Sequence, residues 1–83
     1  MGGKVAIVLK VFPESPEIQE SVKAAIQKMG PAQLIEQAIF GGLNAYKVIF
    51  IRDDKTGEGN YEEELKKIPG VSEVQTEDVT LIS

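Results

Sequence analysis

Leu43-Asn44-Ala45-Tyr46-Lys47-Val48-Ile49-Phe50-Ile51-Arg52 is the stretch that decides the fold. Large side chains occur at every second position, and three of them share one face: Tyr46, Val48 and Phe50. Because successive strand residues point to opposite sides, this pattern predicts a β-strand with one well-buried face. The residues on either side must therefore supply partner strands and a layer that covers this face.

The N-terminal part of the chain predicts a first strand followed by a helix. Residues 4–12 place four apolar side chains on one side of a strand: Val5, Ile7, Leu9 and Val11. Ser15-Pro16-Glu17 is typical of a helix start, with serine as the N-cap and proline at the first helical position. An apolar stripe follows at helical spacing, formed by Ile18, Val22, Ala25, Ile26 and Met29. Gly30-Pro31 ends the helix, with glycine as a left-handed cap.

Two further strands and one short helix complete the chain. Residues 33–39 predict a strand that ends at Phe40-Gly41-Gly42, just before the strand quoted above. After a polar loop over residues 53–60, a short helix carries Tyr61, Leu65 and Ile68, and Pro69-Gly70 ends it. Residues 71–82 predict the last strand, with an irregularity around Thr76-Glu77-Asp78.

The order strand, helix, strand, strand, helix, strand predicts an α+β, ferredoxin-like β-α-β-β-α-β sandwich. In this fold a four-stranded antiparallel sheet carries both helices on one face. The 83 residues fit a single domain over positions 1–83. A chain of this size buries about 60–65% of its unfolded surface, which is enough for one core but not for a deep enzyme cleft.

Composition narrows the chemistry that this domain can perform. The chain has no cysteine and no histidine, which removes disulfides, thiolate nucleophiles and the commonest general base. Its net charge of −4 and its scattered lysines disfavour direct binding of nucleic acid. The longest apolar run, residues 5–9, is too short to cross a bilayer, and no signal-peptide pattern precedes it. We expect a cytoplasmic protein without a membrane contact, without a cofactor and monomeric when free.

Three local clusters have ordinary explanations. The carboxylates of Asp53-Asp54 and Glu62-Glu63-Glu64 are expected to shape a turn and to form a solvated helix face rather than a metal site. Gly57-Glu58-Gly59 lacks the lysine and hydroxyl residue of a phosphate-binding loop. Phe12, Tyr46 and Phe50 would have to face outward to stack on RNA, but they fit core packing at least as well.

Phe40-Gly41-Gly42 is the segment for which a binding role is hardest to dismiss. Two glycines beside an aromatic residue allow a tightly turned backbone that presents the ring and nearby amides to a partner. The alternative is a β-bulge or hairpin whose phenylalanine folds back onto the core.

Three collinear stretches resemble the archaeal elongation factor 1-beta family. They are the first strand with the entry to its helix (residues 9–16), the central segment Ala38-Ile39-Phe40-Gly41-Gly42-Leu43-Asn44-Ala45-Tyr46-Lys47-Val48, and the end (residues 68–74 and 78–82). The resemblance covers nearly the whole chain. It implies the ferredoxin-like fold and a non-enzymatic guanine nucleotide exchange factor that binds the GTPase elongation factor 1-alpha during translation. It implies a contact through these residues: Phe40, Gly41, Gly42, Leu43, Lys55, Gly57 and Leu81.

Two departures from the family pattern bear on this expectation. In the family the phenylalanine directly precedes a glycine-leucine pair, whereas Phe40 stands one position earlier and Gly41 takes the aromatic position. A one-residue shift reverses the side that a strand residue faces, so either a bulge restores its direction or Phe40 is not the contact. The eukaryotic relatives also carry a lysine near the C-terminus, and this chain ends Thr80-Leu81-Ile82-Ser83 without one.

Two other functions fit the same fold. A ligand-sensing or assembly module would pair through a sheet edge or a helix face, without exchange activity. An acylphosphatase-like hydrolase would need an arginine in a phosphate-binding loop, and the sole arginine of the chain, Arg52, is at the end of a predicted strand.

Overall fold

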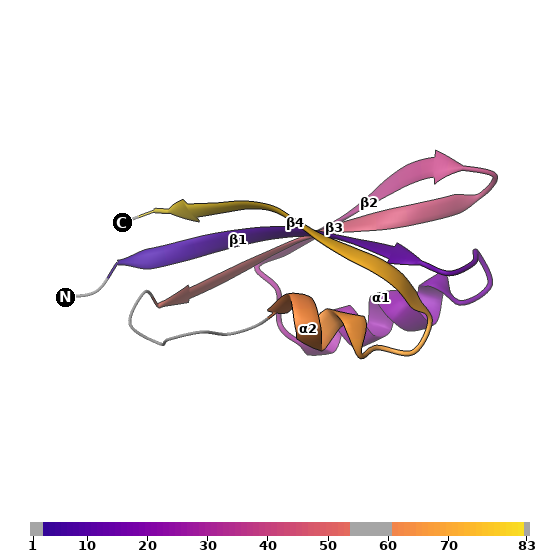
Figure 1. The fold of residues 1–83 in the computed structure, drawn as a ribbon, viewed down its shortest axis with the longest axis horizontal. Coiled ribbons are helices and arrows are strands. Elements are labelled where there is room, and N and C mark those ends of the chain that lie inside the picture. The colour runs from indigo at the N-terminus through magenta and orange to yellow at the C-terminus, as the bar shows by residue number, and fades with distance from the viewer. Residues whose placement is uncertain (1–2, 54–60, 83) are drawn as a thin grey trace.

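The structure is a computed structural model that describes residues 3–53 and 61–82, apart from the side chain of residue 40. Its elements follow the predicted order: β1 (Lys4–Pro13), α1 (Gln19–Lys28), β2 (Gln33–Phe40), β3 (Leu43–Asp53), α2 (Tyr61–Lys66) and β4 (Val71–Leu81). The strands form one antiparallel sheet in the order β2-β3-β1-β4, and both helices lie on the same face of it (Figure 1). This is the predicted ferredoxin-like α+β sandwich.

The core lies between the sheet and the helices. Val11 pairs with Tyr46 and Leu9 with Val48 in neighbouring strands, so their side chains share the face under the helices. From the helix layer, α1 contributes Val22 and Ile26, and α2 contributes Leu65; all three side chains are fully buried. The alternation predicted for β3 is therefore confirmed, because Tyr46, Val48 and Phe50 are all buried.

The opposite side of the sheet has no layer over it among the described residues, and we call it the open face (Figure 1). The strand alternation places these side chains there: Val8, Lys10 and Phe12 of β1, and Lys47, Ile49 and Ile51 of β3. Of the three aromatic residues considered for RNA stacking, Tyr46 and Phe50 are in the core. An RNA platform built on all three is therefore wrong.

The predicted start of α1 is also wrong. Ser15 is not the N-cap, since the helix begins at Gln19 with Ile18 in the cap position and no side-chain cap hydrogen bond. The Ser15 carbonyl instead accepts a hydrogen bond from the Ile18 N–H at 3.3 Å. A proline that follows serine fits the second position of such a turn as well as it fits a helix start. The packing of Ile18 against Gly70 favours the turn.

That contact joins the start of α1 to the turn before β4. The Glu14 N–H donates to the Gly70 carbonyl at 2.8 Å, and the side chain of Ile18 lies where a Cβ atom on Gly70 would be, 2.5 Å from Cδ1. Gly70 has a φ of 95°, in the region that favours glycine. Pro69-Gly70 thus closes one end of the sandwich.

The predicted end of α2 is also wrong, because the helix ends at Lys66 and Ile68 lies in the turn that follows, whereas other predicted boundaries hold. Gly30, with a φ of 74°, follows α1 as the left-handed residue expected there. The irregularity predicted in the last strand is a β-bulge at Glu77, because Leu9 pairs with Thr76 whereas Val8 pairs with Asp78. Neither helix in the described part of the chain is long and apolar enough to cross a membrane.

We predict that Gly70→Ala lowers the free energy of unfolding by about 2–3 kcal/mol, because it adds a left-handed alanine and displaces Ile18. Gly30→Ala is the matched control. It introduces backbone strain of about 1 kcal/mol but meets no atom within 4 Å. Urea unfolding of both variants measures the difference, and equal losses would contradict the packing role of Gly70.

Candidate functional site

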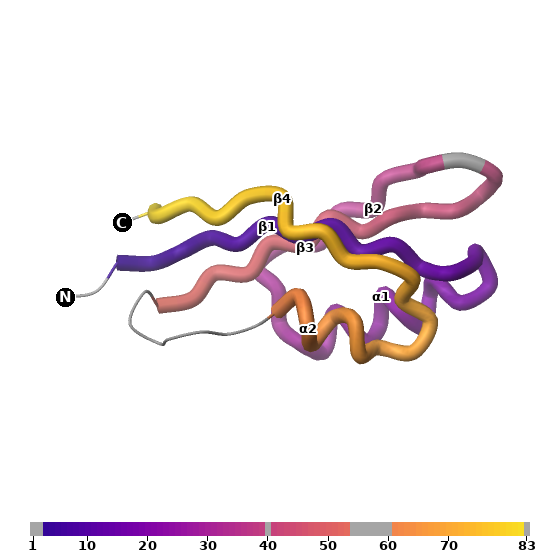
Figure 2. The backbone as a smooth tube through the Cα atoms, viewed as in Figure 1, coloured from indigo at the N-terminus to yellow at the C-terminus, as the bar shows by residue number. Residues whose placement is uncertain are grey.

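The β2–β3 connection is a two-residue hairpin turn at one end of the long axis of the molecule (Figure 2). Gly41 has a φ of 56° and Gly42 a φ of 81°. Positive φ at both central residues is what a type I′ turn requires, and this turn matches the twist of the flanking strands. A Cβ atom at either glycine would meet nothing within 4 Å, so the backbone conformation, not space, demands glycine here.

A register shift precedes this turn. Ala38 pairs with Asn44 and Phe40 pairs with Leu43, which leaves Ile39 as the extra residue of a β-bulge. A bulge is one of the two alternatives that the sequence leaves open for the displaced phenylalanine. The Phe40 side chain itself lies outside what the structure describes, so its contact with a partner stays a prediction.

A polar network connects the base of the hairpin to the start of α1. The Asn44 N–H donates to Gln19 Oε1 at 3.0 Å, and the Tyr46 hydroxyl donates to the Gln19 carbonyl at 3.0 Å. Lys23 Nζ lies 3.0 Å from Glu36 Oε1, and Asn44 Nδ2 donates to the other oxygen of that carboxylate at 3.3 Å. Gln19 and Lys23 belong to α1, whereas Asn44 and Tyr46 belong to β3, so the network joins two elements that are far apart in the sequence. The network joins the base of the hairpin to the first turns of α1.

The network also shifts two ionisation equilibria. The hydrogen bond to Glu36 raises the pKa of the Lys23 ammonium, with the charge of that carboxylate adding to the effect. Burial raises the pKa of the Tyr46 hydroxyl above its ordinary value of 10.0, because the charged phenolate loses hydration there. Both residues therefore keep their neutral-pH protonation states, and the network persists at physiological pH.

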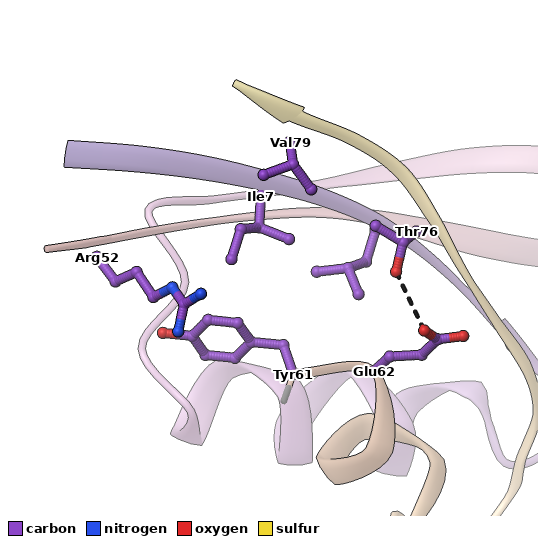
Figure 3. A pocket seen from close by; sticks show the side chains of 7 residues that line it. Ile7, Arg52, Tyr61, Glu62, Thr76 and Val79 are labelled. Atoms are coloured by element: carbon purple, nitrogen blue, oxygen red, sulfur yellow. Dashed lines mark hydrogen bonds between the residues drawn. The ribbon is translucent and has the colours of Figure 1, made fainter. Parts of the chain in front are cut away.

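A pocket of about 190 Å³ lies at the other end of the core, beside α2 (Figure 3). Ile7 and Leu9 form its apolar floor, while its rim carries Arg52, Tyr61, Glu62, Thr76 and Val79. The Tyr61 ring stacks on Phe50 with 4.2 Å between centroids, and Thr76 Oγ1 donates to Glu62 Oε1 at 3.3 Å. Arg52 and Tyr61 both line this pocket (Figure 3). Apolar surface with a polar rim suits a side chain of a partner better than it suits bond chemistry.

Exposed apolar side chains continue from this pocket along β4. Val79 is 60% exposed and Leu81 is 65% exposed, although both lie on the side of the sheet that carries the helices. Among the described residues no helix covers them, because β4 extends past the N-terminal end of α2 (Figure 1). Among residues 3–53 and 61–82 there is no group of acidic side chains that would hold a metal ion.

The residues predicted to share one contact fall into two groups. Gly41, Gly42 and Leu43 are at the hairpin, whereas Leu81 pairs with Val5, which also pairs with Arg52 of β3. From Leu43 to Arg52 the strand rises by about 30 Å, so the two groups lie at opposite ends of the molecule. The expectation that the C-terminal residues lie near the hairpin is therefore wrong. Lys55 and Gly57 lie outside the described residues.

Sequence reasoning missed the network at the hairpin base. Gln19 and Lys23 stand one helical turn apart on the polar side of the apolar stripe, and Glu36 interrupts a largely apolar strand. An ion pair between such an acidic residue and a lysine can be predicted only when the relative positions of the strand and the helix are known. The pocket was missed for the same reason, since its lining comes from four separate elements.

The fold defines a small two-layer α+β protein with a candidate contact region at each end. No protein-family model matches the chain. It is 40% identical over 83 residues to elongation factor 1-beta of Methanosphaerula palustris, covering 95% of this chain and 98% of that protein. It is 39% identical to elongation factor 1-beta of Methanoculleus marisnigri (96% and 99% covered) and 32% identical to that of Thermoplasma acidophilum (96% and 99%). The chain belongs to the elongation factor 1-beta family, a family of translation elongation factors, and the predicted resemblance is confirmed.

We predict that Tyr46→Phe lowers the free energy of unfolding by about 1 kcal/mol at neutral pH, because the Gln19 carbonyl loses its donor. Tyr61→Phe is the matched control, since it keeps the stack on Phe50 and removes no hydrogen bond described for that hydroxyl. Urea unfolding measures both variants. An equal loss in the two would show that the Tyr46 hydroxyl does not hold the hairpin to α1.

The pH dependence of this difference follows from the raised pKa of Tyr46. A hydroxyl whose pKa is higher in the folded state stabilises the fold fully below its ordinary value of 10.0 and progressively less as pH rises through the folded value. We therefore predict that the stability gap between the wild type and Tyr46→Phe narrows above pH 10.0. A constant gap from neutral pH into this alkaline range would contradict the assignment.

Proposed function

We propose that this protein is a guanine nucleotide exchange factor for elongation factor 1-alpha and that it acts by binding, without bond chemistry. The observation that carries the proposal is its identity of up to 40% to archaeal proteins named elongation factor 1-beta, over nearly the full length of both chains. The mechanism is thermodynamic linkage. A protein that binds the nucleotide-free GTPase more tightly than the GDP-bound form weakens GDP binding by the same factor.

The shape of the molecule supports a contact at two places. Its principal extents are 46, 20 and 17 Å, and the hairpin and the C-terminal end of β4 lie at the two ends of the long axis (Figure 1). Phe40 to Leu43 would contact one part of the GTPase while Val79 and Leu81 contact another. A protein that binds two parts of a partner at once stabilises the conformation of the partner in which both parts contact it. The nucleotide-free GTPase would then be the form in which both contacts are made.

The two ends differ in what they offer. The hairpin presents a tight glycine turn whose angle is set by the hydrogen bonds of Asn44 and Tyr46 to Gln19. The opposite end offers the exposed side chains of Val79 and Leu81 beside a pocket with an apolar floor. Burying each of these two side chains fully would contribute about 1.5–3 kcal/mol to binding, before the loss of motional freedom.

Release of a fluorescent GDP analogue from archaeal elongation factor 1-alpha tests the function. We predict an acceleration that saturates with added protein. Phe40→Ala and Leu81→Ala should each slow the accelerated release by about tenfold, the effect of removing one buried apolar anchor. Lys28→Ala, at the exposed end of α1, is the control and should behave as the wild type.

One result would contradict the proposed function, and another would contradict the role of Phe40 alone. A folded protein that does not accelerate release from GTPases of several archaea is not an exchange factor, and a ligand-sensing or assembly module becomes the better assignment. Unchanged acceleration in Phe40→Ala removes this residue from the mechanism and leaves the function in place.

A further inference from the structure

The centre of the open face contains two positive charges directly opposite each other. Lys10 of β1 pairs with Lys47 of β3 in the antiparallel register. Side chains paired in this way have Cβ atoms about 4.5–5.5 Å apart, and like charges at this distance destabilise a sheet. Among the described residues, the ion pairs join Lys23 to Glu36 and Lys66 to Glu62, so neither central lysine has a carboxylate within 4.0 Å. A pair of this kind is unexpected in a chain with a net charge of −4.

Apolar side chains flank the lysine pair. Lys10 Nζ lies 5.5 Å from the centroid of the Phe12 ring on the same strand, which is within cation–π distance. On the other side, Lys47 pairs with Ile35 of β2, which is 37% exposed, and Ile51 of β3 is 46% exposed. The centre of the open face is therefore cationic, and its surroundings are partly exposed and aliphatic.

On the β4 side, Gln75 pairs with Lys10, and acidic residues stand on either side of Gln75 along the open face. Glu73 pairs with Phe12, and Asp78 pairs with Val8, so both carboxylates share the open face with the lysines. A long polyanion laid across this face would meet these negative charges as well as the two lysines. A single carboxylate placed between Lys10 and Lys47 would meet only the attraction at close range. The charge pattern therefore favours an isolated anionic group over a nucleic acid.

We propose that the open face binds an acidic amphipathic segment of another protein. One carboxylate of that segment lies between Lys10 and Lys47, and aliphatic side chains on either side of it contact Phe12, Ile35 and Ile49. This surface is distinct from the two ends proposed to contact the GTPase, and the proposal does not depend on exchange activity. A bound carboxylate would neutralise the repulsion that the free protein carries, so the stability lost in the free sheet is recovered in the complex.

The repulsion itself can be measured in the protein alone. Lys47→Gln should raise the melting temperature by about 2–4 °C at low salt, and the double variant should gain less than the sum of the single variants. Lys10→Gln should raise it by less, because this variant also loses the cation–π contact with Phe12. Lys28→Gln, in the last turn of α1, should not raise it, because a cation at a helix C-terminus is stabilising. Lower melting temperatures in both central variants would mean that the lysines stabilise the free sheet, and the proposal would fail.

Binding is tested with two synthetic amphipathic helices. Both have a leucine-rich face and a glutamine-rich face; one carries a central glutamate among the leucines, and its matched control carries glutamine there. Amide chemical shifts of the isotope-labelled full-length protein report where each peptide binds. We expect saturable shifts at Lys10, Phe12, Lys47 and Ile49, with the glutamate peptide binding about two- to fivefold more tightly. This preference should vanish in the Lys10→Gln/Lys47→Gln double variant and persist in Lys28→Gln.

Other occupants of the open face would give different results. Equal binding of both peptides, or shifts confined to the pocket beside α2, overturns the proposal. Tighter saturation of the same amides by polyuridylate would make the face a nucleic-acid surface, and shifts that grow with protein concentration alone would assign it to a second copy of the chain. Loss of GDP-release activity in the double variant would assign it to the GTPase. Each of these three results also overturns the proposal.

Discussion

The antiparallel pairing of β1 with β3 is the interaction on which the rest of the structure depends. The register that sets Leu9 opposite Val48 and Val11 opposite Tyr46 gathers the largest side chains of both strands on one face. A shift of one residue would turn that set toward solvent and bring the lysine pair into the core. Both helices pack on this face, because Val22, Ile26 and Leu65 belong to the same buried cluster as its side chains.

The lengths of the elements explain why the ends of the molecule are bare. The strands of 10 and 11 residues at the centre of the sheet reach about 33 Å, whereas helices of 10 and 6 residues reach about 15 and 9 Å. The helix layer covers only part of one face. At one end the sheet continues as the β2–β3 hairpin, and at the other it exposes Val79 and Leu81. Both candidate contact regions thus arise from the mismatch between helix and strand rise.

The element order and the core could be predicted from sequence because each depends on local periodicity. The buried face of β3, the glycine cap after α1 and the bulge in β4 all follow from patterns within about ten residues. The start of α1 could not be predicted in this way. Ser15-Pro16 satisfies the rules for a helix cap and for a turn, and only the packing of Ile18 against Gly70 distinguishes them.

The candidate site was harder to predict, because its geometry is set by contacts between distant residues. The sequence alone does not reveal the distance between Leu43 and Leu81. In the folded protein the length of β3 places them about 30 Å apart. The Asn44–Gln19 and Lys23–Glu36 contacts depend on the angle between α1 and the hairpin. The sequence pattern was enough to predict the class of protein and the glycine turn of the hairpin. The separation between the hairpin and the C-terminal end of β4 is visible only in the folded structure.

Amide hydrogen exchange of this protein with nucleotide-free and with GDP-bound elongation factor 1-alpha tests the two-ended contact most directly. We predict binding at least about tenfold tighter to the nucleotide-free form, with new protection in residues 41–44 and 79–82 and none on the exposed side of α1. Equal affinity for the two forms, or protection at one end alone, would contradict the proposal that the length of the sandwich couples binding to nucleotide release.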